Sequence, residues 1–392
     1  MRPMSKSLRV FANSLMLSAA VIFTADLSLG AEWKLEIVDQ SGPGHFASMK
    51  VDLKGNVHIA YVTEQDGHPL KYSYWDHALD KWFTMTIAQN ASFCTLVLDS
   101  KQRPRISYAD FGTGKGAKLR YVYWDGAEWK KQPVSPNNDA VVGYYTSIAL
   151  DAQDRPTLSY YDYEGPAGVG FMLRMRSVSL EGKYWAVHMV DRRMGSGKFN
   201  SIAIDSAGRP HIAYSNVKAE TMSLRYASWD GEEWKTETLE GEKEATGMWS
   251  VSLILDSKDN PHIAYTDVSH RVVKYATRKN GVWEIDAVDK ISKEAYPDRN
   301  GIALDSQGTP YISYYDYGEG ILKVATRKNG KWYGEVLARD FAGFTSSLQI
   351  YDGTIWVAFG DDGAGAFKVA HRPLDEISVP SPPASAAKAI SK

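Results

Sequence analysis

One stretch decides the fold of this chain: Ser201-Ile-Ala-Ile-Asp205-Ser-Ala-Gly208-Arg-Pro210-His-Ile-Ala-Tyr214. Similar stretches recur along the sequence, and their successive closing aromatic residues lie 45 to 54 positions apart. A unit repeated at such a period is typical of propellers and solenoids. The other copies run over Ser48–Tyr61, Thr95–Tyr108, Ser147–Tyr160, Ser252–Tyr265, Gly301–Tyr314 and, in shortened form, Ser347–Phe359.

Each copy predicts four short strands, named a, b, c and d in chain order. Gly208 supplies the turn after strand a, and Pro210 opens strand b. Proline is tolerated there because the first residue of a strand need not donate to the ladder. Asp-Gly or Asn-Gly follows strand c in most copies, and this dipeptide between apolar runs favours a hairpin. A Trp then opens strand d, at Trp82, Trp129, Trp185, Trp234, Trp283 and Trp332.

The copies fit a closed ring. Residues 33–374 amount to seven units of about 49 residues, and the last copy ends after strand c. The stretch 32–39, Glu-Trp-Lys-Leu-Glu-Ile-Val-Asp, matches a strand d at the other end of the chain. No 3.6-residue apolar period persists over ten residues, so helices should be nearly absent. We therefore predict an all-β seven-bladed β-propeller of four-stranded blades, closed by the N-terminal strand joining the C-terminal blade.

The two ends of the chain differ from the repeats. Residues 1–30 carry Arg2, Lys6 and Arg9, then an uncharged apolar run, then small residues before a cut after Gly30. This pattern predicts a signal peptide, with an uncut N-terminal anchor as the alternative. Residues 31–374 form the predicted propeller, and residues 375–392 form a Pro/Ala/Ser-rich tail expected to be disordered. We expect a periplasmic or secreted protein whose mature chain has no membrane span.

Charge and motif content narrow the function classes. The chain has 45 basic and 47 acidic residues and a formal net charge of -2. This balance argues against nucleic-acid binding, because phosphate recognition needs a basic field. One cysteine, Cys94, allows no intramolecular disulfide. The sequence has no glycine-rich phosphate loop, CxxC, HExxH or EF-hand motif, so we expect no cofactor and no metal; we also expect a monomer.

The repeats resemble those of seven-bladed propellers of the sialidase-like, BNR-repeat type found in exported bacterial proteins. The Leu-Lys/Arg-Tyr-Ala strand and the Asp-Ser-x-Gly-x-Pro turn carry this resemblance over residues 33–374. The resemblance implies a propeller fold and a carbohydrate ligand. The sialidase Asp-box, Ser-x-Asp-x-Gly-x-x-Trp, is not matched, and the arginine triad, nucleophilic tyrosine and acids of those enzymes have no assignable counterparts. Sialidase activity is therefore not implied.

Residues present in most copies most simply serve the blade. The strand-d Trp residues are expected to pack between blades, and the strand-a Ser or Thr is expected to line or support the axis. His58, His211 and His262 share one repeat position on different blades, so we do not expect them to converge on a metal. The acid that ends strand b, such as Asp110, is interpreted as the ion-pair partner of the base that opens strand c, such as Arg120. A polar ring around the axis is the alternative.

Residues that break the repeat are better candidates for function. In a propeller the d–a and b–c loops share one face, and here they are the long, variable loops. Most copies place an aromatic residue just before strand a, but the sixth has Tyr296-Pro297-Asp298-Arg299-Asn300. An arginine there suggests an anion contact, because the guanidinium binds carboxylates bidentately. The candidate ligand-binding residues are Arg299, Tyr296, His270, Arg271, Trp249, Tyr145 and Arg192.

These patterns predict an exported propeller that binds a glycan or cell-envelope polymer on its loop face, without chemistry of its own. The first alternative is a polysaccharide lyase, in which an arginine neutralises a uronate carboxylate and His270 or Tyr296 takes the proton alpha to it. A glycoside hydrolase needs two acids at close range, and no pair among the loop acids stands out. A further alternative is a scaffold for a protein partner. No catalytic residue is assigned.

Overall fold

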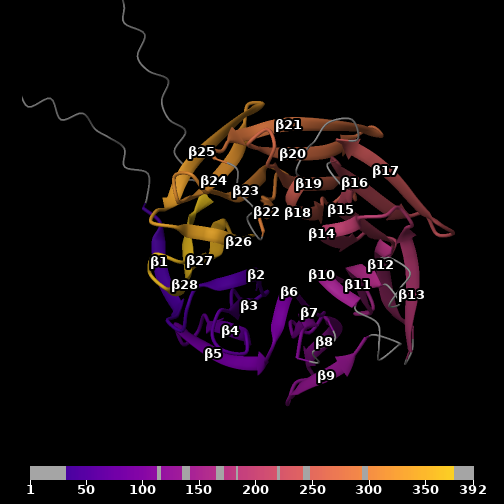
Figure 1. The fold of residues 1–392 in the computed structure, drawn as a ribbon. Helices are drawn as coiled ribbons and strands as arrows, with labels where there is room; N and C mark the ends of the chain where they lie inside the picture. The colour runs from indigo at the N-terminus through magenta and orange to yellow at the C-terminus, as the bar shows by residue number, and fades with distance from the viewer. Residues whose placement is uncertain are drawn as a thin grey trace, which may run out of the picture.

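The computed structural model describes residues 32–112, 116–134, 142–164, 172–181, 184–218, 221–241, 248–293 and 299–374. In these ranges the chain forms seven four-stranded antiparallel sheets around a central axis (Figure 1). This confirms the predicted all-β seven-bladed propeller. The same ranges contain no α-helix, and thus no helix long and apolar enough to cross a membrane. The predicted signal peptide and C-terminal tail lie outside the described residues.

Blades 1 to 4 each take four consecutive strands, ordered a to d from the axis outward (Figure 1). Blade 1 consists of β2 (Gly44–Val51), β3 (Val57–Thr63), β4 (Leu70–Asp76) and β5 (Lys81–Ala88). Blade 2 consists of β6 (Ala91–Leu98), β7 (Pro104–Asp110), β8 (Lys118–Trp124) and β9 (Trp129–Pro133). Blade 3 consists of β10 (Val142–Leu150), β11 (Pro156–Glu164), β12 (Met172–Glu181) and β13 (Tyr184–Asp191). Blade 4 consists of β14 (Ser196–Ile204), β15 (Pro210–Lys218), β16 (Thr221–Trp229) and β17 (Trp234–Glu240).

The last three blades complete the ring. Blade 5 consists of β18 (Met248–Leu255), β19 (Pro261–Asp267), β20 (Val272–Lys279) and β21 (Val282–Lys290). Blade 6 consists of β22 (Gly301–Leu304), β23 (Pro310–Asp316), β24 (Ile321–Lys328) and β25 (Lys331–Ala338). Blade 7 consists of β26 (Ala342–Tyr351), β27 (Thr354–Asp361), β28 (Ala366–Pro373) and, as its outer strand, β1 (Lys34–Asp39). β1 pairs antiparallel with β28, and Lys34 lies opposite His371.

The turn between strands a and b is built around a repeated aspartate. In blade 2 the Asp99 carboxylate accepts hydrogen bonds from the backbone N–H groups of Lys101 and Arg103, both at 2.9 Å. Pro104 then begins β7, where its missing N–H costs no ladder bond. The side chain thus satisfies backbone groups that the turn takes out of the sheet.

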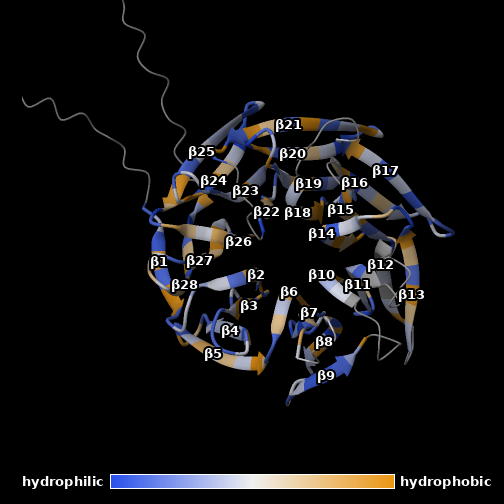
Figure 2. Cartoon of the chain, viewed as in Figure 1, coloured by the Kyte–Doolittle hydropathy of each residue, from blue (hydrophilic) through white to orange (hydrophobic). Residues whose placement is uncertain are grey.

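The hydrophobic core lies between the faces of neighbouring blades. One buried cluster joins Leu70 and Tyr72 of blade 1 to Leu96 and Ile106 of blade 2. The strand-d Trp packs edge-to-face on a strand-c Tyr of the preceding blade, with ring centroids 5.0 Å apart for Trp129 and Tyr72. In outer strands such as β21, hydrophobic and hydrophilic residues are interspersed (Figure 2). The predicted inter-blade role is confirmed, since the contact recurs in Trp185–Tyr121, Trp283–Tyr226 and Trp332–Tyr275.

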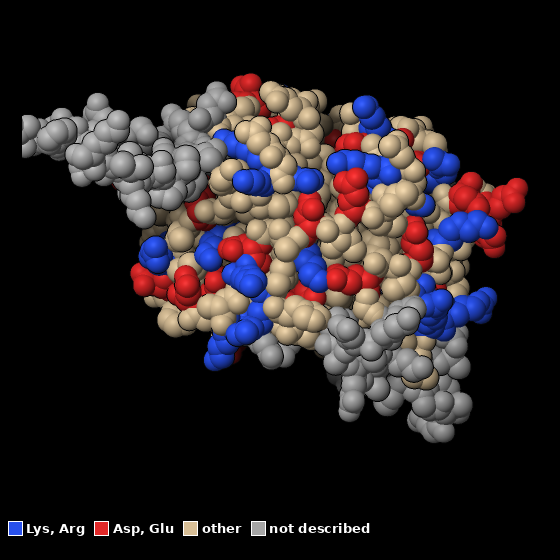
Figure 3. Space-filling view, turned by 90° about the horizontal axis from the view of Figure 1, so that it is seen from above, with Lys and Arg blue, Asp and Glu red and all other residues tan. Residues whose placement is uncertain are grey.

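Polar contacts tie outer strands to the next blade. Between blades 3 and 4, Tyr214 donates to Asp191 at 2.9 Å, and Arg225 contacts the same carboxylate at 3.0 Å. The predicted ion pair within a blade also forms, as between Asp110 and Arg120 at 2.9 Å. On the edge of the ring, acidic and basic side chains are interspersed (Figure 3). The other ties between blades join Tyr61 and Lys71 to Asp39, Tyr265 and Lys274 to Glu240, and Tyr314 and Lys323 to Asp289.

The repeated serine of strand a supports the ring at the axis, as predicted. Neighbouring strands a belong to different sheets, so their inner backbone N–H groups need other partners. Ser48 accepts a hydrogen bond from the N–H of Leu96 in the next blade at 3.0 Å. Blade 6 has Gly301 instead, where a Cβ would lie 2.7 Å from the Leu348 nitrogen. Ser147, Ser201 and Ser347 repeat the bond with Ile202, Leu253 and Met49.

Candidate functional site

An arc of aromatic side chains narrows the central opening on the face that carries the d–a and b–c loops. Phe46, Phe93, Tyr145, Phe199 and Trp249 come from blades 1 to 5 in turn. Their neighbouring ring centroids lie 4.7, 4.5, 4.6 and 4.1 Å apart. These distances are typical of favourable aromatic pairs. We call these five residues the aromatic arc.

The backbone explains why the aromatic arc turns toward the axis. Phe46, Phe93, Tyr145 and Phe199 have positive φ angles of 55°, 53°, 52° and 48°, a conformation that is rare for bulky residues. The pairing of strands a and b shifts register at the same points, as it does at a β-bulge. The bulge re-aims one side chain in each blade, and stacking of neighbouring rings offsets the backbone strain.

Arg299 stands just before strand a in blade 6, where the other blades place members of the arc. Its side chain crosses the axis, and Nη2 donates to Thr95 Oγ1 of blade 2 at 3.0 Å. Three predicted ligand-binding residues, Arg299, Tyr145 and Trp249, thereby line one cavity at the mouth. This cavity measures about 110 Å³, against roughly 300–1,000 Å³ for common ligand pockets. The mouth is therefore small for a sugar residue.

The other predicted ligand-binding residues lie elsewhere on the loop face. His270 and Arg271 are exposed on the b–c loop of blade 5, next to the blade of Arg299. His270 Nδ1 contacts Asp267 Oδ2 at 2.8 Å. Arg192 is exposed on the d–a loop between β13 and β14. Tyr296 lies outside the described residues.

A second cavity on the loop face lies between blades 1 and 2. It measures about 470 Å³, and His45, His68 and Phe111 are among its lining residues. His45 Nε2 contacts Glu64 Oε1 at 3.1 Å. This loop-face cavity is large enough for a small ligand, but none of the predicted ligand-binding residues lines it.

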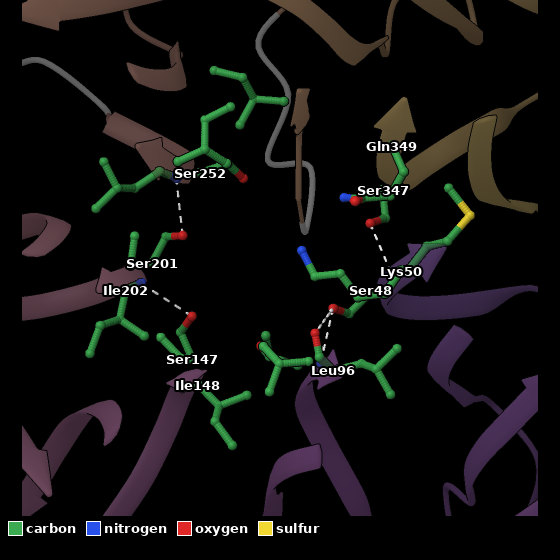
Figure 4. A pocket seen from close by; sticks show the side chains of 18 of the residues that line it. Ser48, Lys50, Leu96, Ser147, Ile148, Ser201, Ile202, Ser252, Ser347 and Gln349 are labelled. Carbon is green, nitrogen blue, oxygen red and sulfur yellow. Dashed lines mark hydrogen bonds between the residues drawn. The ribbon is translucent and has the colours of Figure 1, made fainter. Parts of the chain in front are cut away.

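A larger cavity follows the axis below Arg299 (Figure 4). It measures about 540 Å³ and reaches the ends of strands a and Gln102 in the adjoining turn. The Lys50 side chain extends into it from β2 (Figure 4). Burial and the positive charge of Arg299 lower the pKa of the Lys50 ammonium group. Sequence reasoning missed Lys50, although the equivalent residues of the other blades are uncharged: Val97, Ala149, Ala203, Ile254, Ala303 and Gln349.

Another large cavity lies between blades 1 and 2, beside the a–b turns and away from the aromatic arc. It measures about 530 Å³ and is lined by Tyr74, Phe83 and Met85 of blade 1 and by Trp124 and Trp129 of blade 2. Phe83 and Met85 are 38% and 42% exposed, so this surface offers apolar groups to solvent. We call it groove 1/2. Its polar residues are Asp52, Lys54, Asn56, His58, Lys101, Gln102 and Arg103.

The repeat explains why groove 1/2 is open. At three other junctions an Arg at the end of strand c pairs with an acid on strand d of the preceding blade. In groove 1/2 the strand register puts Trp124 at the arginine position and Met85 at the acid position. An apolar pair thus replaces an ion pair. The ion pairs at the other junctions are Arg278–Glu237 at 3.1 Å, Arg327–Asp286 at 3.1 Å, and Arg372–Glu335.

The junction between blades 3 and 4 repeats this arrangement. Trp229 stands at the arginine position and His188 at the acid position, and a cavity of about 280 Å³ lies there. Trp229 and Trp234 have ring centroids 5.8 Å apart at 63°, against 5.9 Å and 65° for Trp124 and Trp129. We call this cavity groove 3/4. The two grooves share one geometry of paired indole rings.

The ionisable groups Asp52, His58 and Tyr72 of groove 1/2 are hydrogen-bonded to one another. Burial alone would raise the pKa of the Asp52 carboxyl, but hydrogen bonds from His58, Asn56 and backbone amides hold that pKa well below its usual range. His58 Nδ1 also contacts the Tyr72 hydroxyl at 2.6 Å. A glycosidase acid must instead stay protonated near neutral pH. Across the described residues, no group of three or more His, Cys, Asp or Glu could hold a metal ion.

Comparisons with known proteins agree with the observed fold. No protein-family model matches the chain, and no curated protein matches it. The BP39L lectin from Burkholderia pseudomallei aligns with a TM-score of 0.62 at 11% identity, covering 86% of this chain and 97% of the lectin. A PL25 polysaccharide lyase, an ulvan lyase bound to -[GlcA(1-4)Rha3S]-, aligns with a TM-score of 0.57 at 10% identity, covering 88% and 98%. A mutant of the Aleuria aurantia lectin aligns with a TM-score of 0.51 at 12% identity, covering 75% and 96%.

At these identities the likenesses show the shared propeller fold. Lectins and polysaccharide lyases both occur among the similar structures. The more specific resemblance to sialidase-type repeats stays a prediction.

Proposed function

We propose that this protein is an exported glycan-binding module without catalytic activity, and that groove 1/2 and groove 3/4 are its glycan sites. One observation carries the proposal. Both grooves lie where the repeat replaces its inter-blade ion pair by Trp124 with Met85 or by Trp229 with His188. The similarity to two lectin propellers supports a glycan as the ligand.

An aromatic groove with a polar rim suits a sugar. One face of a pyranose ring presents C–H groups that pack on an aromatic ring, while its hydroxyl groups need hydrogen-bond partners. In groove 1/2, Trp124 and Phe83 offer aromatic surface, and Lys54, Asn56 and Lys101 lie among the polar residues. Its volume of about 530 Å³ lies within the range of known ligand pockets.

The absence of catalysis is proposed from the state of the acids in groove 1/2. Asp52 is held ionised by its hydrogen bonds, and His58 lies between Asp52 and Tyr72. Asp52 is therefore not set up to protonate a leaving oxygen at neutral pH. On this basis we propose that groove 1/2 holds a sugar ring without cleaving its glycosidic bond.

Export remains a proposal that rests on residues 1–30. Their basic start, apolar run and small residues before Gly30 are those of a signal peptide. The test is the mass of the protein recovered from the cell envelope or the medium of the expressing cells. A chain beginning at Ala31 supports export, and a full-length chain in the cytoplasm contradicts it.

Glycan binding is tested by retention on a panel of immobilised neutral and uronate-containing polysaccharides. We expect the protein to be retained on at least one of them. Trp124→Ala should weaken its dissociation constant by about 30-fold, equivalent to about 2 kcal/mol, as for a buried aromatic anchor. Phe111→Ala, in the loop-face cavity, is the matched control and should bind normally. Loss of binding in Phe111→Ala alone would move the site to the loop face.

A polysaccharide lyase is the second candidate, and one observation favours it. Arg299 and Lys50 line the same axial cavity, and a lyase needs a cation to neutralise a uronate carboxylate beside a base that takes the alpha proton. The base would take that proton, the bond to the glycosidic oxygen would break, and the departing oxygen would take up a proton from the base or from water, which leaves a double bond in the uronate. A polymer that the protein shortens, with shortening abolished by Lys50→Gln, would replace the binding proposal by this one.

A further inference from the structure

The axial cavity carries two positive charges and no described carboxylate. Lys50 extends into it from blade 1, and Arg299 crosses it from blade 6 (Figure 4 shows Lys50). The other described lining residues contribute hydroxyl, amide and aliphatic groups. The Lys50 ammonium group makes no hydrogen bond or ion pair with any described residue. The edge of the ring differs, because acidic and basic groups alternate there (Figure 3).

Two like charges in one partly buried cavity repel each other. Burial first, and then this repulsion, lowers the pKa of the Lys50 ammonium group. The ring itself does not require the charge, since the other six blades have uncharged residues at the equivalent position, among them Gln349 of blade 7. An anion between Lys50 and Arg299 would convert the repulsion into two attractions.

We propose that the axial cavity is an anion-binding site in which Lys50 and Arg299 together hold a carboxylate, sulfate or phosphate group. The Arg299 guanidinium offers two parallel donors to such a group, and Lys50 offers a compact point charge. The Thr95 hydroxyl lies within hydrogen-bond distance of Arg299 and holds the guanidinium in place. This site is separate from the grooves, and anion binding there requires no bond cleavage, unlike the lyase alternative that would use the same two cations.

The cavity volume bears on the source of the anion. At about 540 Å³ it can take a small organic acid or one acidic sugar residue as well as an inorganic ion. The recognised chemistry is the same in each case, namely an oxyanion next to two cations. Sulfate, phosphate and glucuronate are therefore the probes that distinguish a free inorganic ion from the acidic end of a glycan.

The test is isothermal calorimetry of the purified full chain with each probe at constant ionic strength. We expect saturable binding of at least one probe, and at least a tenfold weaker dissociation constant in Lys50→Gln. Lys50→Gln copies the residue that blade 7 already tolerates at this position. Lys50→Arg keeps the positive charge and should keep the binding. Lys34→Gln removes an exposed charge at the outer strand and should bind as the wild type does.

Binding of the inorganic probes supports a free ion as the occupant, and binding of glucuronate alone supports an acidic sugar. No saturable binding of any probe, or equal affinities in the wild type and Lys50→Gln, would overturn the proposal. The circular-dichroism spectrum and thermal midpoint of Lys50→Gln show whether it folds. Trp124→Ala should keep the anion affinity while losing the polysaccharide, so this proposal and the groove proposal can fail separately.

Discussion

The junctions between blades 4 and 5, 5 and 6, and 6 and 7 differ from those between blades 1 and 2 and blades 3 and 4. In the first set an arginine and an acid close the space between blades, as Arg278 and Glu237 do at 3.1 Å. In the second set Trp124 and Trp229 take the arginine position, and cavities of about 530 and 280 Å³ lie beside them. In these five junctions the same two positions hold either an ion pair or a tryptophan beside a cavity, whereas between blades 7 and 1 Trp75 stands at the arginine position and Glu36 on β1 accepts a hydrogen bond from Trp82.

This difference teaches that a repeat protein can create a binding surface without a new loop. The backbone of each blade is fixed by the strand ladders, the turn aspartate and the strand-d Trp. Exchanging the side chains at two outer positions leaves that frame unchanged. If the proposed function holds, the aromatic residues Trp124 and Trp229 offer a ligand the surface that the ion pairs close at the other junctions.

The largest effect is expected from breaking a sealed junction. Arg372→Ala removes a guanidinium that is 5% exposed, pairs with Glu335 and lies 4.5 Å over the Trp33 ring. Loss of one partner of a buried ion pair costs about 3–5 kcal/mol, and we expect a loss at the lower end of this range because the Glu335 side chain is 22% exposed. Urea unfolding of wild type and variant measures this loss. A loss below about 1 kcal/mol would mean that the pair does not seal the junction.

The junction between blades 7 and 1 gives a pH-dependent effect of intermediate size. Glu36 on β1 accepts hydrogen bonds from His371 at 3.1 Å and Trp82 at 2.9 Å. The hydrogen bond from His371 has the largest effect on the pKa of Glu36, and burial opposes it. The hydrogen bond from Trp82 adds to the effect of His371, so that the pKa falls from 4.5 to about 2.

Because the folded pKa lies below the unfolded one, the Glu36 carboxylate stabilises the fold above pH 4.5, and the contribution is lost as pH falls toward 2. Glu36→Gln should lower the free energy of unfolding by about 1.5–3 kcal/mol at pH 7. The difference from wild type should shrink steadily in urea unfolding series between pH 4.5 and 2. An equal difference at all pH values would contradict this assignment.

The smallest effect is expected at an exposed sealed junction. Arg278 and Glu237 occupy the same repeat positions as Arg372 and Glu335, but their side chains are 37% and 39% exposed. Exposed ion pairs contribute about 0–1 kcal/mol, so Arg278→Ala should barely change the urea midpoint. The contrast with Arg372→Ala tests whether burial, and not repeat position, sets the contribution of the pair. Equal losses in both variants would remove that distinction.

The sequence predicted the ring because its signals are local and repeated seven times. The turn aspartate, the opening proline and the hairpin dipeptides each fix a backbone conformation that neighbouring residues cannot alter. The register of strands that are joined by long loops is harder to predict from the sequence. In blade 3 both Arg174 and Arg176 lie on strand c, and only the strand register shows that Asp162 pairs with Arg174 and the closing Tyr160 with Arg176.

The candidate site was less predictable, since it depends on which blades face each other. Arg299 breaks the repeat visibly, but its contact with Thr95 joins residues 204 positions apart. Groove 1/2 can be recognised in the sequence only when Met85 of one copy is compared with Trp124 of the next copy. Neither residue is unusual within its own copy. Comparing equivalent positions between successive copies would have found both this pair and Lys50.

The most direct test of the account is to seal groove 1/2 by the chemistry that the repeat itself uses. The double variant Met85→Glu with Trp124→Arg installs the Glu237 and Arg278 arrangement between blades 1 and 2. The measurement is its affinity for the polysaccharide that the wild type retains best. If the open groove is the glycan site, the double variant folds and its dissociation constant is weaker by at least tenfold. A folded double variant with wild-type affinity would contradict the central claim that the open groove is the glycan site.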